Sequence, residues 1–470
     1  MANSTVRLSQ KEQWRTILEG QKVHAKKEYS VNLKRRRKLL SQLKSMLMNH
    51  EEAWLEALRA DLGKPSVEAY ASELAVLYNE IDYVDKHLAK WMRPKRLTRL
   101  LPGGLEKVKI ERQGYGTVLI ISPWNYPLNL SLMPMIGAFA AGNSCFLKPS
   151  ELARTTAQLL EELLSEYFTP EEVTVVQGDA FVAENLLKLP WDMIFFTGSK
   201  RVGTIVHQAA ARHQIPIILE LGGKNPCIVD ATGVSPTTAR RIVWGKFLNA
   251  GQTCIAPDTI YVHQSMYQPF LTMLREQIKL FYGMNPAKSS DYGRIAHPGH
   301  YNKLIGYLQE GTIWHGGRID ASQNYIEPTL LTDIPLNSEL RQAEIFGPIL
   351  PVIPYSDLDA LMHQLEEGPD PLVTYMFSED RTSIQQLKKT QRTGAISVNQ
   401  VIRHAANPRI PFGGVGTSGF GRYHGQASIE AFSYEKVYYK EHSIFEMKNQ
   451  YPPYRPHVLP ILRKLRRWLF

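Results

Sequence analysis

Between residues 117 and 221 the chain alternates short apolar runs with amphipathic runs, and this rhythm constrains the fold more than any other feature. The apolar runs cover residues 117–121, 144–147, 173–176, 193–196 and 215–219. The runs between them, at 132–141, 155–167, 182–187 and 202–212, have helical patterns. Strands that are mainly apolar and alternate with helices are typical of a parallel sheet covered on both faces. We therefore predict an α/β fold with a doubly wound parallel sheet.

The rest of the chain divides around this region. Residues 9–60 and 69–92 carry helical apolar stripes, and the turn Pro102-Gly103-Gly104 follows them. A second α/β series begins near Asn225 and continues to about Asn399. It includes a helix-like run at 239–249. In parallel sheets, ligands bind at the carboxyl ends of the strands, so the segments that follow the apolar runs are expected to carry functional residues.

Cysteine usage limits the chemistry. Cys145, Cys227 and Cys254 are the only cysteines, an odd number that gives no disulfide framework, and no metal-type spacing of Cys and His occurs. We predict no metal and a reducing, cytoplasmic setting. The polar stretch 1–10 lacks the apolar core of a signal peptide, and no uninterrupted run of about 18 apolar residues predicts a membrane span.

Part of the net charge of +10 is concentrated in short basic clusters. One cluster is Lys34-Arg35-Arg36-Arg37-Lys38, which lies in a helical pattern with Leu33, Leu40 and Leu43 on one side. We interpret it as a solvated helix face. The chain lacks aromatic interleaving and any nucleic-acid-binding module signature, so we predict no nucleic-acid partner.

Cys254 is the candidate nucleophile, because it follows the glycine turn Gly251-Gln252-Thr253 while the other two cysteines lie in apolar runs. A lone cysteine is more often inert, so other groups must support this interpretation. Asn125 could donate a hydrogen bond to an oxyanion, jointly with the Cys254 N–H, or could only cap a turn. Glu220 could act as a base, or could form an ion pair with Lys224.

Several segments suggest a dinucleotide site. Gly198-Ser199-Lys200-Arg201-Val202-Gly203 joins a strand to a helix, where free N–H groups could bind a pyrophosphate. Lys148 and Glu151 could reach an adenosine ribose, and the carboxylate would disfavour a 2′-phosphate. Glu344 could hold the second ribose with Phe346 near a nicotinamide, or this stretch could be a charged turn with a core Phe. The literal GxGxxG at 414–419 has no clear strand before it, so we interpret it as a loop.

Together and in this order, seven motifs are highly specific. They are Pro-Trp-Asn at 123–125, Lys-Pro-Ser-Glu at 148–151, Phe-Thr-Gly-Ser at 196–199, Leu-Glu-Leu-Gly-Gly-Lys at 219–224, Gly-Gln-Thr-Cys at 251–254, Glu-Ile-Phe-Gly-Pro at 344–348 and Pro-Phe-Gly-Gly at 411–414. The chain, from about residue 10 to residue 440, resembles the aldehyde dehydrogenase superfamily. Gly-Gln-Thr-Cys-Ile-Ala-Pro-Asp at 251–258, Gly-Phe-Gly-Arg-Tyr-His-Gly at 419–425 and Tyr-Pro-Pro-Tyr at 451–454 look like its class 3 branch, which acts on fatty and aromatic aldehydes.

The resemblance implies an oxidoreductase that converts aldehydes to carboxylic acids, with NAD, or alternatively NADP, as cofactor. It implies Cys254 as nucleophile, Glu220 as general base and Asn125 as oxyanion donor. The implied cofactor-binding residues are Trp124, Lys148, Ser150, Glu151, Thr197, Gly198, Ser199, Gly203, Leu221, Glu344 and Phe346. Lys200 departs from the Thr that many members carry, which leaves the pyrophosphate geometry open.

The resemblance also implies a domain division and a homodimer. An NAD-binding domain would comprise 1–92, 114–221 and about 400–425, and a catalytic domain 222–399. A bridging oligomerisation element would comprise 93–113 and 426–442. The basic amphipathic tail, 443–470, holds apolar residues among a second basic cluster: Leu459, Ile461, Leu462, Leu465, Trp468, Leu469 and Phe470. It could pack across a dimer or over the substrate funnel, or lie on an anionic membrane surface.

Three alternative functions stay open on the residues alone. A thiol hydrolase or acyltransferase could use Cys254 and Glu220 without a nucleotide. A dehydrogenase could pass the acyl group to coenzyme A, although Glu220 favours water as acceptor. A non-catalytic scaffold protein would be expected to lack a nucleophile or base, and this chain has both.

Overall fold

The five predicted strands between residues 117 and 221 form one sheet in the computed structural model, which describes residues 2–27, 32–101, 104–443 and 451–469. They are β3 (Thr117–Ile121), β4 (Ser144–Lys148), β5 (Val173–Val175), β6 (Met193–Gly198) and β7 (Ile217–Leu221). All five are parallel, in the order β7-β6-β3-β4-β5, and β17 (Gly419–Phe420) pairs antiparallel with β7. β7 begins after Pro216, which has no N–H to donate, and it includes Glu220.

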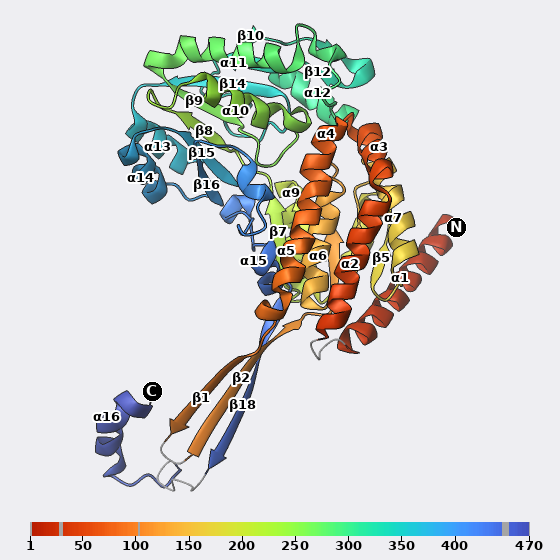
Figure 1. The fold of residues 1–470 in the computed structure, drawn as a ribbon, viewed down its shortest axis with the longest axis vertical. Coiled ribbons are helices and arrows are strands. Elements are labelled where there is room, and N and C mark those ends of the chain that lie inside the picture. The colour runs from red at the N-terminus through yellow and green to blue at the C-terminus, as the bar shows by residue number, and fades with distance from the viewer. Residues whose placement is uncertain (1, 28–31, 102–103, 444–450, 470) are drawn as a thin grey trace.

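Helices cover both faces of this sheet, as predicted (Figure 1). Alternate strand residues bury two different cores, with Ile120 in one and Leu119 in the other. The first core contains α2 (Leu33–Asn49), α5 (Ala75–Trp91), α6 (Asn129–Ala141) and α7 (Arg154–Tyr167). The second contains α1 (Ala2–Lys27), α8 (Ala180–Leu186) and α9 (Lys200–Arg212). Three shorter elements, α3 (Glu51–Leu62), α4 (Ser66–Ala69) and the π-helical turn η1 (Tyr70–Leu74), connect α2 to α5.

The predicted solvated face at residues 34–38 is wrong for Arg36. Lys34, Arg37 and Lys38 are exposed, but Arg36 is 1% exposed. Its Nη1 donates to Ala140 O at 3.0 Å, at the carboxyl end of α6. Carbonyls in the last turn of a helix have no partner within the helix, and a guanidinium can satisfy them.

A second α/β unit follows, built on a seven-stranded sheet in the order β10-β13-β14-β9-β8-β15-β16. Its strands are β8 (Pro226–Val229), β9 (Thr259–His263), β10 (Thr312–His315), β13 (Thr329–Thr332), β14 (Ile349–Tyr355), β15 (Val373–Phe377) and β16 (Ala395–Val398). Only β10 runs antiparallel to its neighbour among these described strands. Its helices are α10 (Pro236–Phe247), α11 (Tyr267–Tyr282), α12 (Pro298–Tyr307), α13 (Leu358–Glu366) and α14 (Arg381–Thr390), and β11 (Ile319–Asp320) pairs with β12 (Tyr325–Ile326).

A three-stranded antiparallel arm projects from the first unit (Figure 1). It consists of β1 (Lys95–Leu101), β2 (Gly104–Gly114) and β18 (Ser433–Ser443), with β2 in the centre. Residues 426–431, which we predicted to belong to this element, lie instead in α15 (Gly425–Ala431). This helix packs on α6, where a Cβ at Gly137 would lie 2.7 Å from the Ser428 side chain. Close packing on a helix of the first unit explains the difference.

The tail ends in α16 (Val458–Leu469). Its described apolar side chains Leu459, Ile461 and Leu462 are about half exposed. Phe470, and the side chains of Leu465, Trp468 and Leu469, lie outside the described residues. Among the helices that the structure describes, none is both long and apolar enough to cross a bilayer.

Candidate active site

Cys254 lies beyond a sharp turn that interrupts the chain after α10. The predicted helix 239–249 ends at Phe247, because Asn249 and Ala250 have φ values of 53° and 52°. Gly251 follows with φ of 78°, and a Cβ there would overlap the carbonyl of Gly347. Left-handed backbone is uncommon without glycine, so three successive residues of this kind mark a locally strained segment.

Cys254 as a residue is partly exposed, whereas Cys145 and Cys227 are buried in β4 and β8. Burial raises the pKa of Cys254 to about 12, and the nearby carboxyl groups of Glu344 and Glu220 add to the increase. The N–H groups of Cys254 and Ile255 oppose it by hydrogen bonding. The resting thiol is therefore protonated at neutral pH, and it needs a proton acceptor before it can act as a nucleophile.

Asn125 lies in the segment that follows β3 and is 3% exposed. Its Nδ2 donates to Gln252 O at 3.0 Å, and its backbone oxygen accepts a bond from Asn249 Nδ2 at 2.7 Å. An amide NH₂ carries two N–H donors, so one remains for another acceptor. The structure thus brings Asn125 against the turn that carries Cys254, as an oxyanion donor requires.

Glu220 lies in β7 and is buried. Neither of its carboxyl oxygens has a hydrogen-bond partner in the described part of the chain. Burial raises its pKa well above 4.5, and the Arg422 guanidinium opposes the shift. The alternative ion pair with Lys224 is absent among the described residues, because Lys224 pairs with Asp258. A buried carboxyl that lacks partners is a position where a water or ligand is expected.

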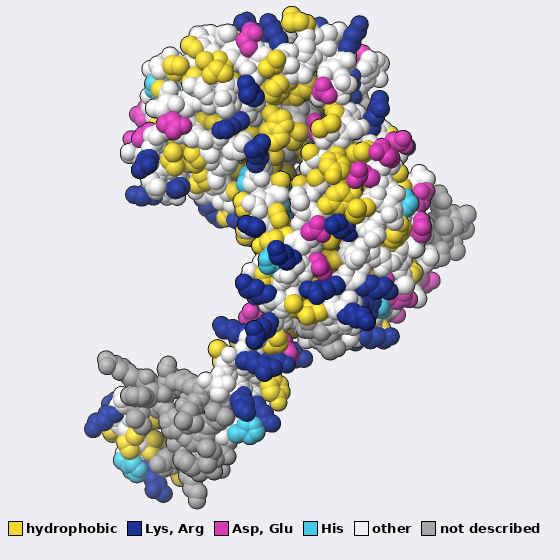
Figure 2. Space-filling model, viewed as in Figure 1, with side chains coloured by type: hydrophobic (Ala, Val, Ile, Leu, Met, Phe, Trp, Pro, Cys, Tyr) yellow, Lys and Arg dark blue, Asp and Glu magenta, His cyan; other side chains and the backbone are white. Residues whose placement is uncertain are grey.

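These three residues line one cavity of about 890 Å³. Aromatic and aliphatic side chains form much of its wall, and Figure 2 shows hydrophobic side chains gathered on this face where the two α/β units meet. The apolar lining residues include Val67, Val76, Leu130, Trp244, Leu280, Phe281, Ile402 and Phe412. The arrangement can hold an apolar molecule with one reactive end at Cys254.

Part of the predicted cofactor set lines the same cavity: Trp124, Thr197, Gly198, Ser199, Leu221, Glu344 and Phe346. Ser199 caps α9, since its Oγ accepts the Val202 N–H at 3.4 Å. Thr197 Oγ1 is buried and has no partner in the described chain. Lys200 is the exposed first residue of α9. A helix N-terminus that opens on the cavity suits a pyrophosphate.

The other predicted cofactor residues, Lys148, Ser150, Glu151 and Gly203, lie outside the lining of this cavity as described. Lys148, at the end of β4, is buried and donates to Glu151 Oε2 at 2.7 Å. Ser150 Oγ accepts the Leu152 N–H at 3.3 Å. Gly203 lies in α9, where a Cβ would meet the Leu221 side chain at 2.5 Å, so it sets the packing of α9 on β7.

Glu344 and Phe346 approach the cavity from the segment before β14. Glu344 Oε1 accepts the Gly223 N–H at 3.3 Å, and a Cβ on Gly222 would overlap this carboxyl. Burial raises the pKa of Glu344 to about 8, and the Asp258 charge adds to it. The Phe346 ring lies edge-on to Trp124, with ring centroids 5.5 Å apart.

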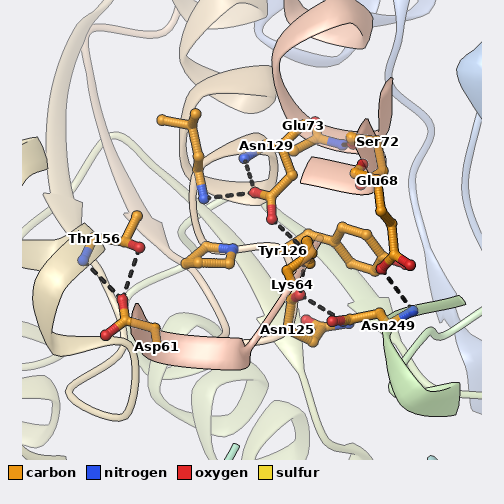
Figure 3. Close-up of polar contacts among 12 residues, drawn as sticks. Asp61, Lys64, Glu68, Ser72, Glu73, Asn125, Tyr126, Asn129, Thr156 and Asn249 are labelled. Carbon is orange, nitrogen blue, oxygen red and sulfur yellow. Dashed lines mark hydrogen bonds and ion pairs between the residues drawn. The ribbon is translucent and has the colours of Figure 1, made fainter. Parts of the chain in front are cut away.

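Two groups of residues at or near the cavity were not predicted from the sequence. His300 and Lys303 of α12 line the cavity, and His300 Nε2 donates to Phe346 O at 2.7 Å. Lys64, Glu68 and Glu73 form a polar group beside Asn125, in which Lys64 and Glu73 are buried and Glu68 is half-buried (Figure 3). None lies in a motif that we used, and only their charge within an apolar helical region could have drawn attention to them.

The glycine-rich stretch 414–419 has no helix after it. It contains a short 3₁₀ turn, Gly416–Ser418, and leads into β17. Without a following helix N-terminus it lacks the donors of a phosphate loop. This agrees with its interpretation as a loop.

The chain is similar to known proteins along most of its length. A model of the Aldehyde dehydrogenase family matches residues 3–438. The chain is 55% identical to a 4,4'-diapolycopene-4,4'-dial dehydrogenase of Cytobacillus firmus, covering 87% of this chain and 90% of that protein. It is 40% identical to Aldehyde dehydrogenase family 3 member B1 of Rattus norvegicus, covering 90% and 91%. A solved structure of Staphylococcus aureus AldH in its substrate-bound state superimposes with a TM-score of 0.91 at 40% identity, covering 96% of this chain and 99% of that one.

Proposed function

Because the chain belongs to the aldehyde dehydrogenase family, we propose that it oxidises the aldehyde end of long apolar or aromatic molecules to a carboxylic acid, with Cys254, Asn125 and Glu220 as its catalytic residues. One observation carries this proposal. The thiol, the buried carboxyl that lacks partners and the buried amide all line one largely apolar cavity.

Cys254 forms the covalent bond to the substrate. Its proton leaves to a neighbouring acceptor as the aldehyde binds, since only the thiolate is an effective nucleophile. The sulfur attacks the carbonyl carbon, and negative charge develops on the oxygen. The remaining N–H of the Asn125 amide and the Cys254 backbone N–H stabilise that oxygen.

The residues present fit the NAD(P) that this family uses. Thr197 Oγ1 offers a buried hydroxyl without a partner, and Ser199 marks the open N-terminus of α9. Glu344 offers a carboxylate for a ribose, and Phe346 and Trp124 offer aromatic surface. When bound, NAD(P)⁺ supplies the hydride acceptor that oxidises the adduct on Cys254 to a thioester. We propose NAD as the cofactor, with NADP as the alternative; the carboxylate of Glu151, beside Lys148, is the group that would disfavour a 2′-phosphate.

Glu220 completes the reaction. Its carboxylate takes a proton from a water molecule, the water oxygen attacks the thioester carbon, and the carboxylic acid leaves Cys254. Burial raises the pKa of Glu220, which makes its carboxylate a stronger base than an exposed one. Water rather than coenzyme A is thus the proposed acyl acceptor.

The apolar wall supports long or aromatic substrates, because the many hydrophobic lining residues leave few groups to recognise a polar chain. The 55% identical relative is named for a dialdehyde, 4,4'-diapolycopene-4,4'-dial. We therefore include long polyene aldehydes beside medium- and long-chain aliphatic and aromatic ones.

The arm supports a homodimer. Its outer strands β1 and β18 each have one edge without a partner strand in the described sheet, and Val437, Tyr438 and Tyr439 on β18 are more than half exposed. Long exposed edges favour pairing with another chain. We propose the arm as the oligomerisation element, the two α/β units as cofactor and catalytic domains, and a cytoplasmic location, which the three free cysteines support.

The direct test is NADH or NADPH absorbance with NAD⁺ or NADP⁺ and a series of aldehydes. Hexanal to dodecanal, benzaldehyde and a polyene aldehyde would be compared for wild type, Cys254→Ala and the matched control Cys145→Ala. We expect a signal that rises with substrate length, survives in Cys145→Ala and disappears in Cys254→Ala. Ester hydrolysis that needs Cys254, without any nucleotide reduction, would instead support a thiol hydrolase.

A further inference from the structure

The segment from Lys64 to Leu74 lies between the helices of the first unit and the turn that carries Cys254. It contains α4 and η1, and Val67, Glu68 and Ser72 from it line the cavity. π-Helical turns are rare and frequently occur at functional sites. Figure 3 shows the polar contacts of this segment, which reach both the Asn125 loop and the Cys254 turn.

Glu68 holds the strained turn before Cys254. Its Oε1 accepts the backbone N–H of Asn249 at 2.7 Å. Asn249 is the first of the three residues with positive φ, and Cys254 follows five positions after it. Strained backbone persists only where surrounding contacts over-determine it. Glu68 supplies such a contact from outside the turn.

Lys64 and Glu73 hold the Asn125 loop from the other side. Both side chains are 0% exposed and form an ion pair. Lys64 Nζ also donates to Asn125 O at 3.3 Å and lies 4.1 Å from the centroid of the Tyr126 ring. Glu73 Oε2 accepts two backbone N–H groups at the start of α6, at 3.0 and 3.1 Å. A buried pair whose remaining hydrogen-bonding sites are satisfied fixes its surroundings, because losing either partner leaves a charge uncompensated.

The Asn125 loop and the turn before Cys254 are also joined to each other by hydrogen bonds. Asn249 Nδ2 donates to Asn125 O at 2.7 Å, and Asn125 Nδ2 donates to Gln252 O at 3.0 Å. The Tyr126 hydroxyl is hydrogen-bonded to Thr253 Oγ1 at 2.6 Å. Any shift at Asn249 is therefore transmitted to the amide of Asn125 and to the residue before Cys254.

We propose that Glu68, supported by the Lys64–Glu73 pair, is a positioning residue that sets the place of the Cys254 sulfur relative to the Asn125 amide. It acts through the Asn249 N–H and not on the substrate. The inference rests on the proposed function of Cys254 and Asn125, and it adds a residue that no motif contains.

A role for Glu68 in proton exchange can be distinguished from its proposed positioning role. It lines the cavity, and burial raises its pKa to about 7 against the opposing Lys64 charge, so it could instead exchange a proton during the reaction. Glutamine separates the two roles. Its side-chain oxygen can accept the Asn249 N–H, but its amide cannot exchange a proton at neutral pH.

The experiment compares full-length Glu68→Gln, Glu68→Leu and Glu68→Ala. It measures kcat and KM for an aldehyde, and the rate at which iodoacetamide alkylates Cys254, located by peptide mass spectrometry. We expect Glu68→Leu and Glu68→Ala to lower kcat about tenfold, the effect of one lost, partly buried hydrogen bond, with KM within about twofold. Their alkylation rates should differ from that of wild type, and Glu68→Gln should restore both kcat and the alkylation rate.

Glu80→Leu is the matched control. Glu80 is another buried carboxyl whose pKa burial raises to about 7, and its Oε1 accepts the Gly425 N–H at 2.6 Å, where φ is 52°. This variant loses the hydrogen bond to the Gly425 N–H but should keep the wild-type alkylation rate at Cys254. A Glu68→Gln enzyme as impaired as Glu68→Leu, or a Glu68→Leu enzyme with wild-type kcat and alkylation, would overturn the proposal. Alkylation needs neither cofactor nor turnover, so it stays informative even if Cys254→Ala were to remain active.

Discussion

At the residue scale, the proposed chemistry depends on groups whose hydrogen-bonding capacity the fold leaves partly unused. Glu220 has two buried oxygens without partners in the described chain, and Asn125 uses one of its two amide N–H groups on Gln252. Buried polar groups are nearly always satisfied in folded proteins. Unused capacity at a cavity therefore marks where substrate oxygen and water are expected to bind.

Replacing Asn125 tests the oxyanion donor. One such donor is typically worth about 3 kcal/mol of barrier, so Asn125→Ala should lower turnover by about 100-fold or more. Steady-state kinetics would measure this, with the melting temperature as a check that the variant folds. Near-normal turnover in a folded variant would refute the role of Asn125.

Motifs identified the residues proposed to do chemistry, but not those that hold them. Cys254 stood out because it follows a glycine turn, whereas Asn125 follows an apolar run and Glu220 ends one. Lys64 and Glu68 did not, because charged residues in helical segments are usually solvated. Lys64 pairs with Glu73 and contacts Asn125, and Glu68 contacts Asn249; Asn125 and Asn249 come from other parts of the fold.

At the element scale, the strands of the first sheet were predictable because they are buried on both faces and read as nearly continuous apolar runs. The left-handed turn after α10 and the π-helical turn η1 were not predictable. Residues 248–250 have no glycine, and their backbone conformation depends on the contact from Glu68 and on bonds to Asn125 and Gln252. Local propensity does not contain such tertiary contacts.

Gly251→Ala tests the strain in this turn. The added Cβ would overlap Gly347 O at a residue whose φ is 78°, and we expect a loss of stability on the order of 1–3 kcal/mol with reduced activity. Chemical denaturation and kinetics would measure both. Gly306→Ala is the control, since nothing lies within 4 Å of its Cβ in α12. Equal stabilities for the two variants would contradict the account.

The buried carboxyl of Glu80, which links α5 to the first residue of α15, should make the stability of the protein depend on pH. Burial raises its folded-state pKa from 4.5 to about 7, so ionisation costs the folded state on the order of 3 kcal/mol. That cost is absent below pH 4.5, where the carboxyl is protonated in both states, and complete above about pH 7.

Glu80→Gln removes this cost and should therefore be more stable than wild type at pH 8.5, with a smaller gain or none at pH 5. Urea denaturation at the two pH values would measure the difference. A stability change that is the same at both values would show that Glu80 does not titrate as described.

At the scale of the whole molecule, the charged residues are distributed unevenly along the chain. Residues 93–114 and 433–470 contain 15 Lys and Arg and 5 Asp and Glu, a net charge of +10 that equals that of the whole chain. Figure 2 shows basic side chains along the arm and the adjoining part of the first unit. The rest of the chain, which contains the active-site cavity, is neutral overall.

This distribution supports contact between the tail and an anionic membrane surface, since basic residues near such a surface contribute about 1 kcal/mol each. Truncation after Tyr454 removes five of the basic residues, together with α16. We expect weaker co-sedimentation with anionic vesicles and no change with neutral ones. Unchanged co-sedimentation would refute membrane contact, and a changed oligomeric mass or aldehyde KM would support packing across the dimer or over the substrate funnel.

The measurement that tests the central claim most directly is a single-turnover experiment on Glu220→Gln. Rapid mixing with NAD⁺ and a long-chain aldehyde would follow NADH absorbance, and intact-protein and peptide mass spectrometry would follow Cys254. The account predicts a burst of about one NADH per subunit, then little turnover, with an acyl adduct on Cys254, because the thioester forms but is not hydrolysed. Steady NADH release at the wild-type rate, or a burst without an adduct on Cys254, would contradict it.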